Sequence, residues 1–141
     1  MRIARLLLPL AAVAAAAVPA AALAARADTM APVIVIKAGT LGKVLATPKH
    51  LGLYTWDTEK KAGGKVKCVA SCATVWPPVI VAAGEKIPAH LKGVMEMLGT
   101  VKRPDGRTQL TVGGLPAYTF QKDTANVVLC DGTDGWHAIR A

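Results

Sequence analysis

The residues best suited to chemistry in this sequence are two cysteines four positions apart, Cys68 and Cys72. In an oxidising compartment such a pair forms a disulfide when the intervening segment is a turn or a distorted helix. As free thiolates the two cysteines would instead bind a soft metal such as Cu(I), with His90, Met95 and Met97 as candidate further ligands. The disulfide, with no metal or cofactor, is the favoured interpretation, and a copper site is the alternative.

The remaining reactive side chains do not form a catalytic pattern. Cys130 is the odd cysteine of the three, and it is expected to be buried or to link two chains as a dimer. His50 and His137 have no serine, cysteine or carboxylate pair at a spacing that nucleophilic or acid–base catalysis requires. The sequence therefore predicts that the protein is not an enzyme.

All six aromatic residues belong to an internal repeat. Each copy has a tyrosine, a second aromatic two positions later, an acid three positions after that and a distant tryptophan, which gives Tyr54, Trp56, Glu59 and Trp76, then Tyr118, Phe120, Asp123 and Trp136. Residues two apart on a strand face the same side. The favoured interpretation is that the rings build the core while the acid caps the following turn. In the alternative, the six rings form a binding surface that stacks on a sugar, a peptide or a lipid headgroup.

The elements that must position these residues are short strands. Strand-like runs are rich in β-branched residues or alternate in polarity, at 33–36, 42–45, 51–56, 79–81, 108–112, 117–120 and 136–139. Arg103-Pro104-Asp105-Gly106 predicts a hairpin turn, because proline presets φ, aspartate bonds its own backbone and glycine accepts positive φ. The one helix is expected at 88–98. The fold class is all-β: one small domain of about eight short strands and one short helix, with two pseudo-repeats packed together.

The first 27 residues have the layout of a signal peptide. A basic start is followed by an apolar run from Leu6 to Leu23 and by small residues that fit an A-x-A cleavage site. The segment 28–39 is then an N-terminal extension carrying the first strand. No cysteine for lipid attachment lies near the cleavage site, and no later apolar run is long enough to span a membrane. The mature protein is expected in the periplasm or outside the cell.

The charge of the chain is moderately positive. The whole sequence carries a net charge of +8, and removing the signal peptide lowers the net charge to about +5. One small, moderately basic domain excludes a multidomain enzyme and a strongly charged nucleic-acid binder. The run from Lys60 to Lys67 is suited to anionic lipid or cell-wall polymers, and it has no interleaved aromatics for nucleic acid.

Taken together, these motifs resemble a known family, the bacterial secreted-repeat proteins, described as predicted lipoproteins with a Tyr-x-(Phe/Trp/Tyr)-x-x-Asp motif. The likeness runs from about residue 40 to 140 and includes both tyrosine motifs, the cysteine block up to Trp76-Pro77-Pro78, Arg103-Pro104-Asp105-Gly106-x-x-Gln109 and Gly135-Trp136-His137. It implies a secreted-repeat domain at 40–141, with repeats at about 40–83 and 97–141. The family implies an envelope location and no enzyme class.

This chain departs from the family pattern at three points. It lacks the lipid-attachment cysteine, Glu59 stands where the first motif has Asp, and Ala117 precedes the second tyrosine in place of Leu. The expected function is that of an exported, non-catalytic envelope module that binds a protein or a cell-wall component. The alternative is a periplasmic copper-binding or thiol-redox protein that uses Cys68 and Cys72.

Overall fold

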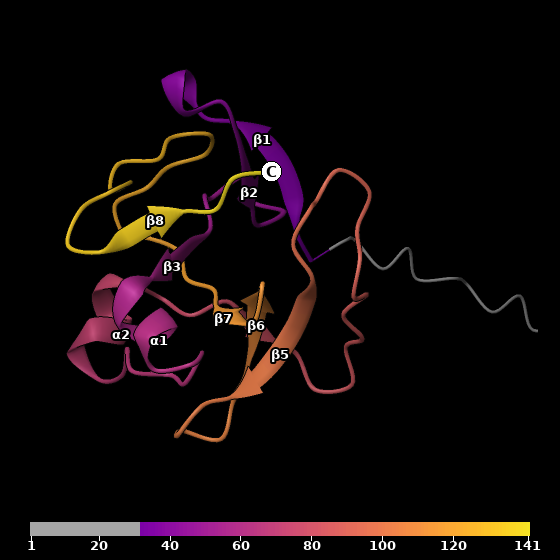
Figure 1. Cartoon of the computed structure of the whole chain (residues 1–141), viewed down its shortest axis with the longest axis vertical. Helices are drawn as coiled ribbons and strands as arrows, with labels where there is room; N and C mark the ends of the chain where they lie inside the picture. The colour runs from indigo at the N-terminus through magenta and orange to yellow at the C-terminus, as the bar shows by residue number, and fades with distance from the viewer. Residues whose placement is uncertain (1–31) are drawn as a thin grey trace, which may run out of the picture.

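The computed structural model describes residues 32–141, so the predicted signal peptide (1–27) lies outside the described residues (Figure 1). The strands are β1 (Ile34–Lys37), β2 (Lys43–Ala46), β3 (Tyr54–Trp56), β4 (Ile80–Val81), β5 (Leu98–Lys102), β6 (Thr108–Val112), β7 (Leu115–Pro116) and β8 (Trp136–Ala138). Two five-residue helices, α1 (Asp57–Lys61) and α2 (Ser71–Val75), and a short 3-10 turn (Gly39–Leu41) complete the fold. The predicted all-β class is confirmed.

The strands form three small antiparallel sheets. One pairs β1 with β2, a second pairs β3 with β8, and the largest has the order β4-β6-β5 with β7 also on β6. The β5–β6 hairpin has the turn that the sequence predicted: the Arg103 N–H donates to the Arg107 carbonyl at 2.9 Å, and Gly106 has φ of 82°. Glycine tolerates this left-handed conformation without a Cβ clash.

Alternation along the central strands divides the interior into two cores. Val44 and Ala46 of β2 point into one core, while Leu45 between them points into the other. The first, which we call the aromatic core, contains the buried rings Tyr54, Trp76, Tyr118 and Trp136 together with Cys68. The second, the aliphatic core, contains Val33, Leu45, Leu53, Val81, Leu98, Leu110, Val112 and Ala117.

The prediction of a helix at 88–98 is wrong. This segment consists of turns and bends that run into β5, and Gly93 at its centre has φ of 81°, which is incompatible with an α-helix. Leu91 and Val94, whose spacing suggested a helical face, instead pack from this loop against the aliphatic core. The strand predicted at 117–120 is also wrong in extent, because β7 ends at Pro116 and Tyr118 pairs only through isolated bridges.

Two short helices form in the structure, α1 where a turn was expected and α2 where a turn or a distorted helix was expected. α1 has Asp57 and Glu59 in its first turn and Lys60 and Lys61 in its last, so these charges interact favourably with the helix dipole. Within residues 32–141, no helix has the length and apolar character needed to cross a bilayer.

A disulfide joins Cys68 and Cys72, whose Cα atoms lie 5.2 Å apart at the start of α2. The loop that it closes is only five residues long, since the sequence separation is four. On the chain-entropy account, a loop of this length stabilises the fold by about 2 kcal/mol.

Reduction of this disulfide is therefore expected to lower the free energy of unfolding by about 2 kcal/mol. Urea unfolding with and without a thiol reductant measures the difference. A Cys130→Ser variant is the matched control, and it should lose the same amount on reduction because Cys130 forms no disulfide among the described residues. Equal unfolding midpoints in both conditions would contradict the prediction.

Candidate functional site

The two tyrosine motifs meet at the centre of the molecule. Tyr54 at the start of β3 and Tyr118 after β7 form an antiparallel bridge, in which each backbone N–H donates to the other residue's carbonyl at 2.9 and 3.0 Å. The two copies of the repeat are therefore related by an approximate two-fold axis that passes between these tyrosines.

Each tyrosine is held by the acid of the other copy. The Tyr54 hydroxyl donates to Asp123 Oδ2 at 2.7 Å, and the Tyr118 hydroxyl donates to Glu59 Oε1 at 2.7 Å. Glu59 is fully buried and Asp123 nearly so. Buried carboxylates are costly unless they are hydrogen-bonded, so this exchange fixes how the two copies pair.

Each acid also closes a loop within its own copy. Glu59 Oε1 accepts from the backbone N–H of Lys67 at 2.7 Å and of Cys68 at 3.1 Å. Asp123 Oδ1 accepts from the N–H of Leu129 at 3.0 Å. The sequence suggested only that each acid caps the following turn. In the structure each acid also accepts a hydrogen bond from the tyrosine of the other copy. Glu59 Oε2 is buried and accepts no hydrogen bond from residues 32–141.

The six aromatic rings form one continuous array, which we call the aromatic column. Trp76 and Trp136 stack at its centre, with centroids 3.9 Å apart and planes within 9°. Each tryptophan also packs on the second motif aromatic of the other copy: Trp136 on Trp56 at 5.1 Å and Trp76 on Phe120 at 4.8 Å. The tyrosines contribute edge contacts at 5.2 Å, Tyr54 to Trp76 and Tyr118 to Trp136.

The six rings do not together form an exposed surface in the structure. Four of these rings are buried, with Tyr54 and Tyr118 inaccessible and Trp136 and Trp76 exposed by only 3% and 8%. Trp56 and Phe120, at the two ends of the column, are half-buried. With so few aromatics available, the chain uses them to fill one core, which the core interpretation anticipated.

A second buried polar group was missed by the sequence analysis. Arg103 was assigned to the hairpin turn, but its side chain is 1% exposed and donates from Nη1 to Gln109 Oε1 at 2.6 Å and from Nη2 to the Cys68 carbonyl at 2.9 Å. Gln109 Nε2 in turn donates to the Ala117 carbonyl at 2.8 Å. The signal was available, because a cation and an amide flank the turn six residues apart.

The residues of the alternative copper site lie against different cores. Cys68 is buried in the aromatic core and bonded to Cys72, so neither sulfur is a thiolate. His90, Met95 and Met97 are exposed on the loop that covers the aliphatic core, Met95 by 83%. Among the described residues, no group of three or more His, Cys, Asp and Glu side chains is arranged to hold a metal.

The remaining reactive side chains lie near the surface. His137 Nε2 lies 3.1 Å from Asp57 Oδ2, and His50 Nδ1 lies 3.0 Å from Asn126 Oδ1. Both histidines are exposed and hydrogen-bonded. Cys130 is half-buried against the aromatic core, and its burial raises the pKa of the thiol. A raised pKa leaves less reactive thiolate.

The paired tyrosines give the stability of the fold a pH dependence in alkali. Burial, and then the hydrogen bond to a carboxylate, raises the pKa of Tyr54 and of Tyr118 well above its usual range. Above about pH 10 the unfolded chain releases these two protons while the folded protein keeps them. The free energy of unfolding should therefore fall by about 1.4 kcal/mol per pH unit for each tyrosine.

Urea unfolding between about pH 9 and 11.5 measures this slope. Tyr54→Phe removes one of the two phenols and should halve the alkaline slope. A flat free energy across this range in the wild type would show that the tyrosines ionise equally easily in both states.

Two copies of one motif, which bond each other's acids and share the aromatic column, define a two-repeat β domain. The chain belongs to the family described as a secreted repeat of unknown function, which it matches over residues 35–80 and 99–140, more than half of its length. The protein is therefore an exported one. No curated protein and no solved structure matches the chain significantly.

Proposed function

We propose that the protein is a non-catalytic binding module for polyanions of the cell envelope, acting without a metal or other cofactor in the periplasm or outside the cell. One observation carries the proposal. All eleven lysines of the chain are exposed, and none forms an ion pair within residues 32–141. The ion pairs found there use Arg103, Arg107, Arg140 and His137 instead.

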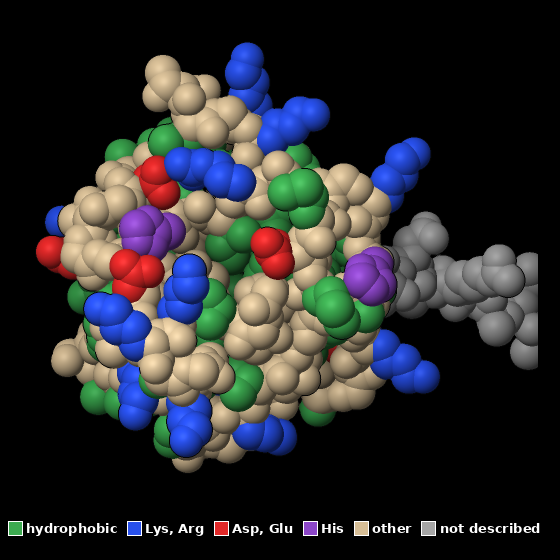
Figure 2. Space-filling model, viewed as in Figure 1, with side chains coloured by type: hydrophobic (Ala, Val, Ile, Leu, Met, Phe, Trp, Pro, Cys, Tyr) green, Lys and Arg blue, Asp and Glu red, His purple; other side chains and the backbone are tan. Residues whose placement is uncertain are grey.

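The acidic residues leave most of this positive charge uncompensated. Glu59 and Asp123 are buried on the tyrosines, while Asp57, Asp105 and Asp131 are occupied by His137 or arginine. Figure 2 shows Lys and Arg side chains projecting around much of the outline, with several gathered over α1. The four exposed lysines of the basic run, on α1 and in the loop after it, are Lys60, Lys61, Lys65 and Lys67.

Unpaired lysines on a fixed scaffold favour binding to a polyanion. Each lysine that contacts a phosphate-rich polymer or surface releases condensed counterions, which drives association at low salt. A lysine near an anionic membrane contributes about 1 kcal/mol in the same way. Four of the six motif aromatics are buried in the core, so the lysines supply most of the unpaired charge on the described surface.

The protein is expected to bind long-chain polyphosphate, with an affinity that falls on the order of tenfold or more between about 50 and 200 mM salt. Isothermal titration calorimetry measures this. Replacing the four lysines of the basic run with glutamine should weaken binding further at low salt. No binding at low salt, or binding insensitive to salt, would contradict the proposal.

A further inference from the structure

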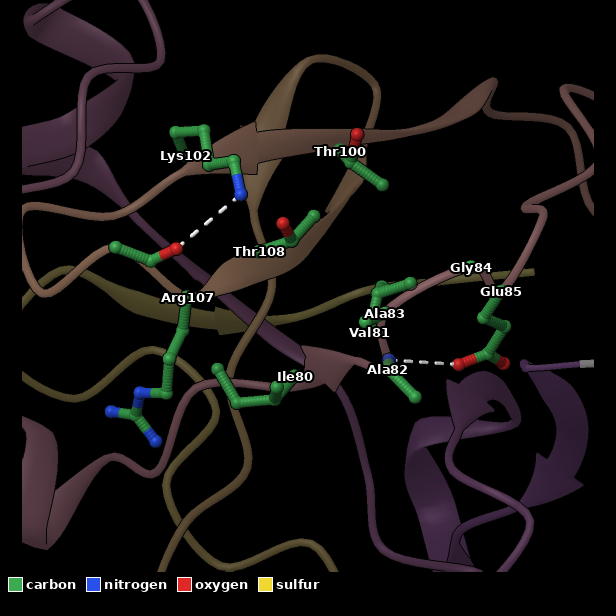
Figure 3. A pocket seen from close by; sticks show the side chains of 11 residues that line it. Ile80, Val81, Ala82, Ala83, Gly84, Glu85, Thr100, Lys102, Arg107 and Thr108 are labelled. Atoms are coloured by element: carbon green, nitrogen blue, oxygen red, sulfur yellow. Dashed lines mark hydrogen bonds between the residues drawn. The ribbon is translucent and has the colours of Figure 1, made fainter.

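One end of the largest sheet is left uncovered and forms a groove. The groove, of about 570 Å³, lies between β4, the loop that follows it, and the ends of β5 and β6 next to their turn. Figure 3 shows Thr100, Lys102, Thr108 and Ile80 around it, with Arg107 and Glu85 toward opposite ends. We call it the hairpin groove, and its volume lies within the range of small-molecule sites.

The strand register explains why the groove is polar. Thr108 pairs with Lys102 on one side and with Val81 on the other, and Thr100 pairs with Leu110. Directly paired residues share one face of a sheet. Val81 and Leu110 belong to the aliphatic core, so Thr100, Lys102 and Thr108 lie on the core-facing side of the sheet. At this end of the sheet these polar residues take the place of aliphatic ones, which makes the groove polar.

The groove carries an excess of positive charge at the hairpin end. Lys102 and Arg107 line this end, and Arg107 donates to the carboxylate of Asp105. The Arg107 hydrogen bonds hold the pKa of Asp105 well below its usual range, so this carboxylate stays ionised and is paired with Arg107 rather than with Lys102. Among the described residues, Lys102 Nζ donates only to the Gly106 carbonyl, at 3.3 Å, which leaves two of its protons available.

Two neutral donors lie beside this cation. Within residues 32–141, the hydroxyls of Thr100 and Thr108 make no hydrogen bond, and both residues line the groove. At the opposite end Glu85 Oε2 accepts from the Ala82 N–H at 3.0 Å, and Glu85 remains exposed. A ligand that fits this order of groups bears an anion at one end and hydroxyl groups toward the other.

We propose that the hairpin groove binds the glycerol-phosphate type of unit, a phosphate ester of a small polyol, with the phosphate on Lys102, Thr100 and Thr108 and a polyol hydroxyl toward Glu85. Lysine binds phosphate as a point charge, and hydroxyls complete the shell of donors. The unit occurs both in anionic lipid headgroups and in phosphodiester polymers of cell walls. This inference rests on the proposed function and gives it a defined site.

The test is a titration of the ¹⁵N-labelled protein with glycerol 3-phosphate, followed by amide chemical shifts. The amides of Thr100, Lys102, Thr108 and the loop 82–85 should shift together. Lys102→Gln should weaken binding about tenfold, the worth of one hydrogen bond to a charged group. Lys92→Gln removes the same charge from an exposed position outside the groove, and it should leave the affinity nearly unchanged.

A second pair of variants separates a built site from general attraction. Thr100→Val and Thr108→Val remove a hydroxyl without changing charge or branching, and each should weaken binding severalfold. Equal losses of affinity from Lys102→Gln and Lys92→Gln, or chemical-shift changes spread over all lysines, would overturn the assignment of the groove as the binding site. Neither result would contradict polyphosphate binding. Absence of polyphosphate binding would overturn the proposed function as well.

Two further measurements identify the source of the unit. Sedimentation with phosphatidylglycerol vesicles, reversed by free glycerol 3-phosphate and reduced by Lys102→Gln, would support a lipid headgroup. Binding to a soluble poly(glycerol phosphate) chain in preference to vesicles would support a wall polymer. Vesicle and polymer binding that free glycerol 3-phosphate does not reverse would overturn the assignment of the groove.

Discussion

Trp136→Ala is expected to lower the free energy of unfolding by about 3–5 kcal/mol, which is typical for loss of a large buried aromatic. Trp136 lies between Trp76 and Trp56 in the aromatic column and receives the edge of Tyr118. Its removal opens a cavity at the approximate two-fold axis, which the short strands around it cannot close by moving together. Chemical denaturation followed by circular dichroism measures the loss.

The matched control for this substitution is Trp56→Ala. Trp56 occupies one end of the column, is half-buried and stacks on a single ring, so its loss should be clearly smaller. Equal losses for Trp56→Ala and Trp136→Ala would show that stacking neighbours and burial do not set the energy of this column.

Glu59→Ala is expected to cost at least about 3 kcal/mol, because three donors lose their acceptor at once. These donors are the Tyr118 hydroxyl and the backbone N–H groups of Lys67 and Cys68. A donor left unsatisfied on burial costs about 1–3 kcal/mol, and two of the three hydrogen bonds are fully buried. Urea unfolding measures the change.

Two variants define what Glu59 contributes. Glu96→Ala removes a carboxylate that is exposed and makes no hydrogen bond among the described residues, so it should change stability by no more than about 0.5 kcal/mol. Tyr118→Phe combined with Glu59→Ala forms a double-mutant cycle, and the pair should lose less than the sum of the single variants. Additive losses would mean that the 2.7 Å hydrogen bond between them contributes nothing.

The parts of the fold that could be predicted from the sequence are those governed by local rules. The β5–β6 hairpin follows from Pro104, Asp105 and Gly106, whose conformational preferences act within a few residues. The all-β class follows from short β-branched runs such as Val33 to Ile36. The helix predicted at 88–98 failed because the spacing of Leu91 and Val94 fits a loop that packs on the aliphatic core equally well, and Gly93 decides between the two.

The candidate site was harder to predict, because its defining contacts join distant residues. The repeat of tyrosine and acid is visible in the sequence, but its spacing cannot show that Tyr54 bonds Asp123, 69 residues away. The same holds for Arg103, whose partner Cys68 is 35 residues distant. The hairpin groove escaped sequence analysis entirely, since it depends on which end of the sheet stays uncovered.

The exchange of acids between the two copies has a consequence for how such a chain is assembled. Tyr54 with Asp123, and Tyr118 with Glu59, are the same contact made twice in opposite directions, which is the rule of an isologous interface. The column repeats the rule, since each tryptophan stacks on the motif aromatic of the other copy. In these terms the protein is a pseudo-symmetric dimer of half-domains on a single chain. One half alone would expose an acid, a tyrosine and a tryptophan that only a second half can bury.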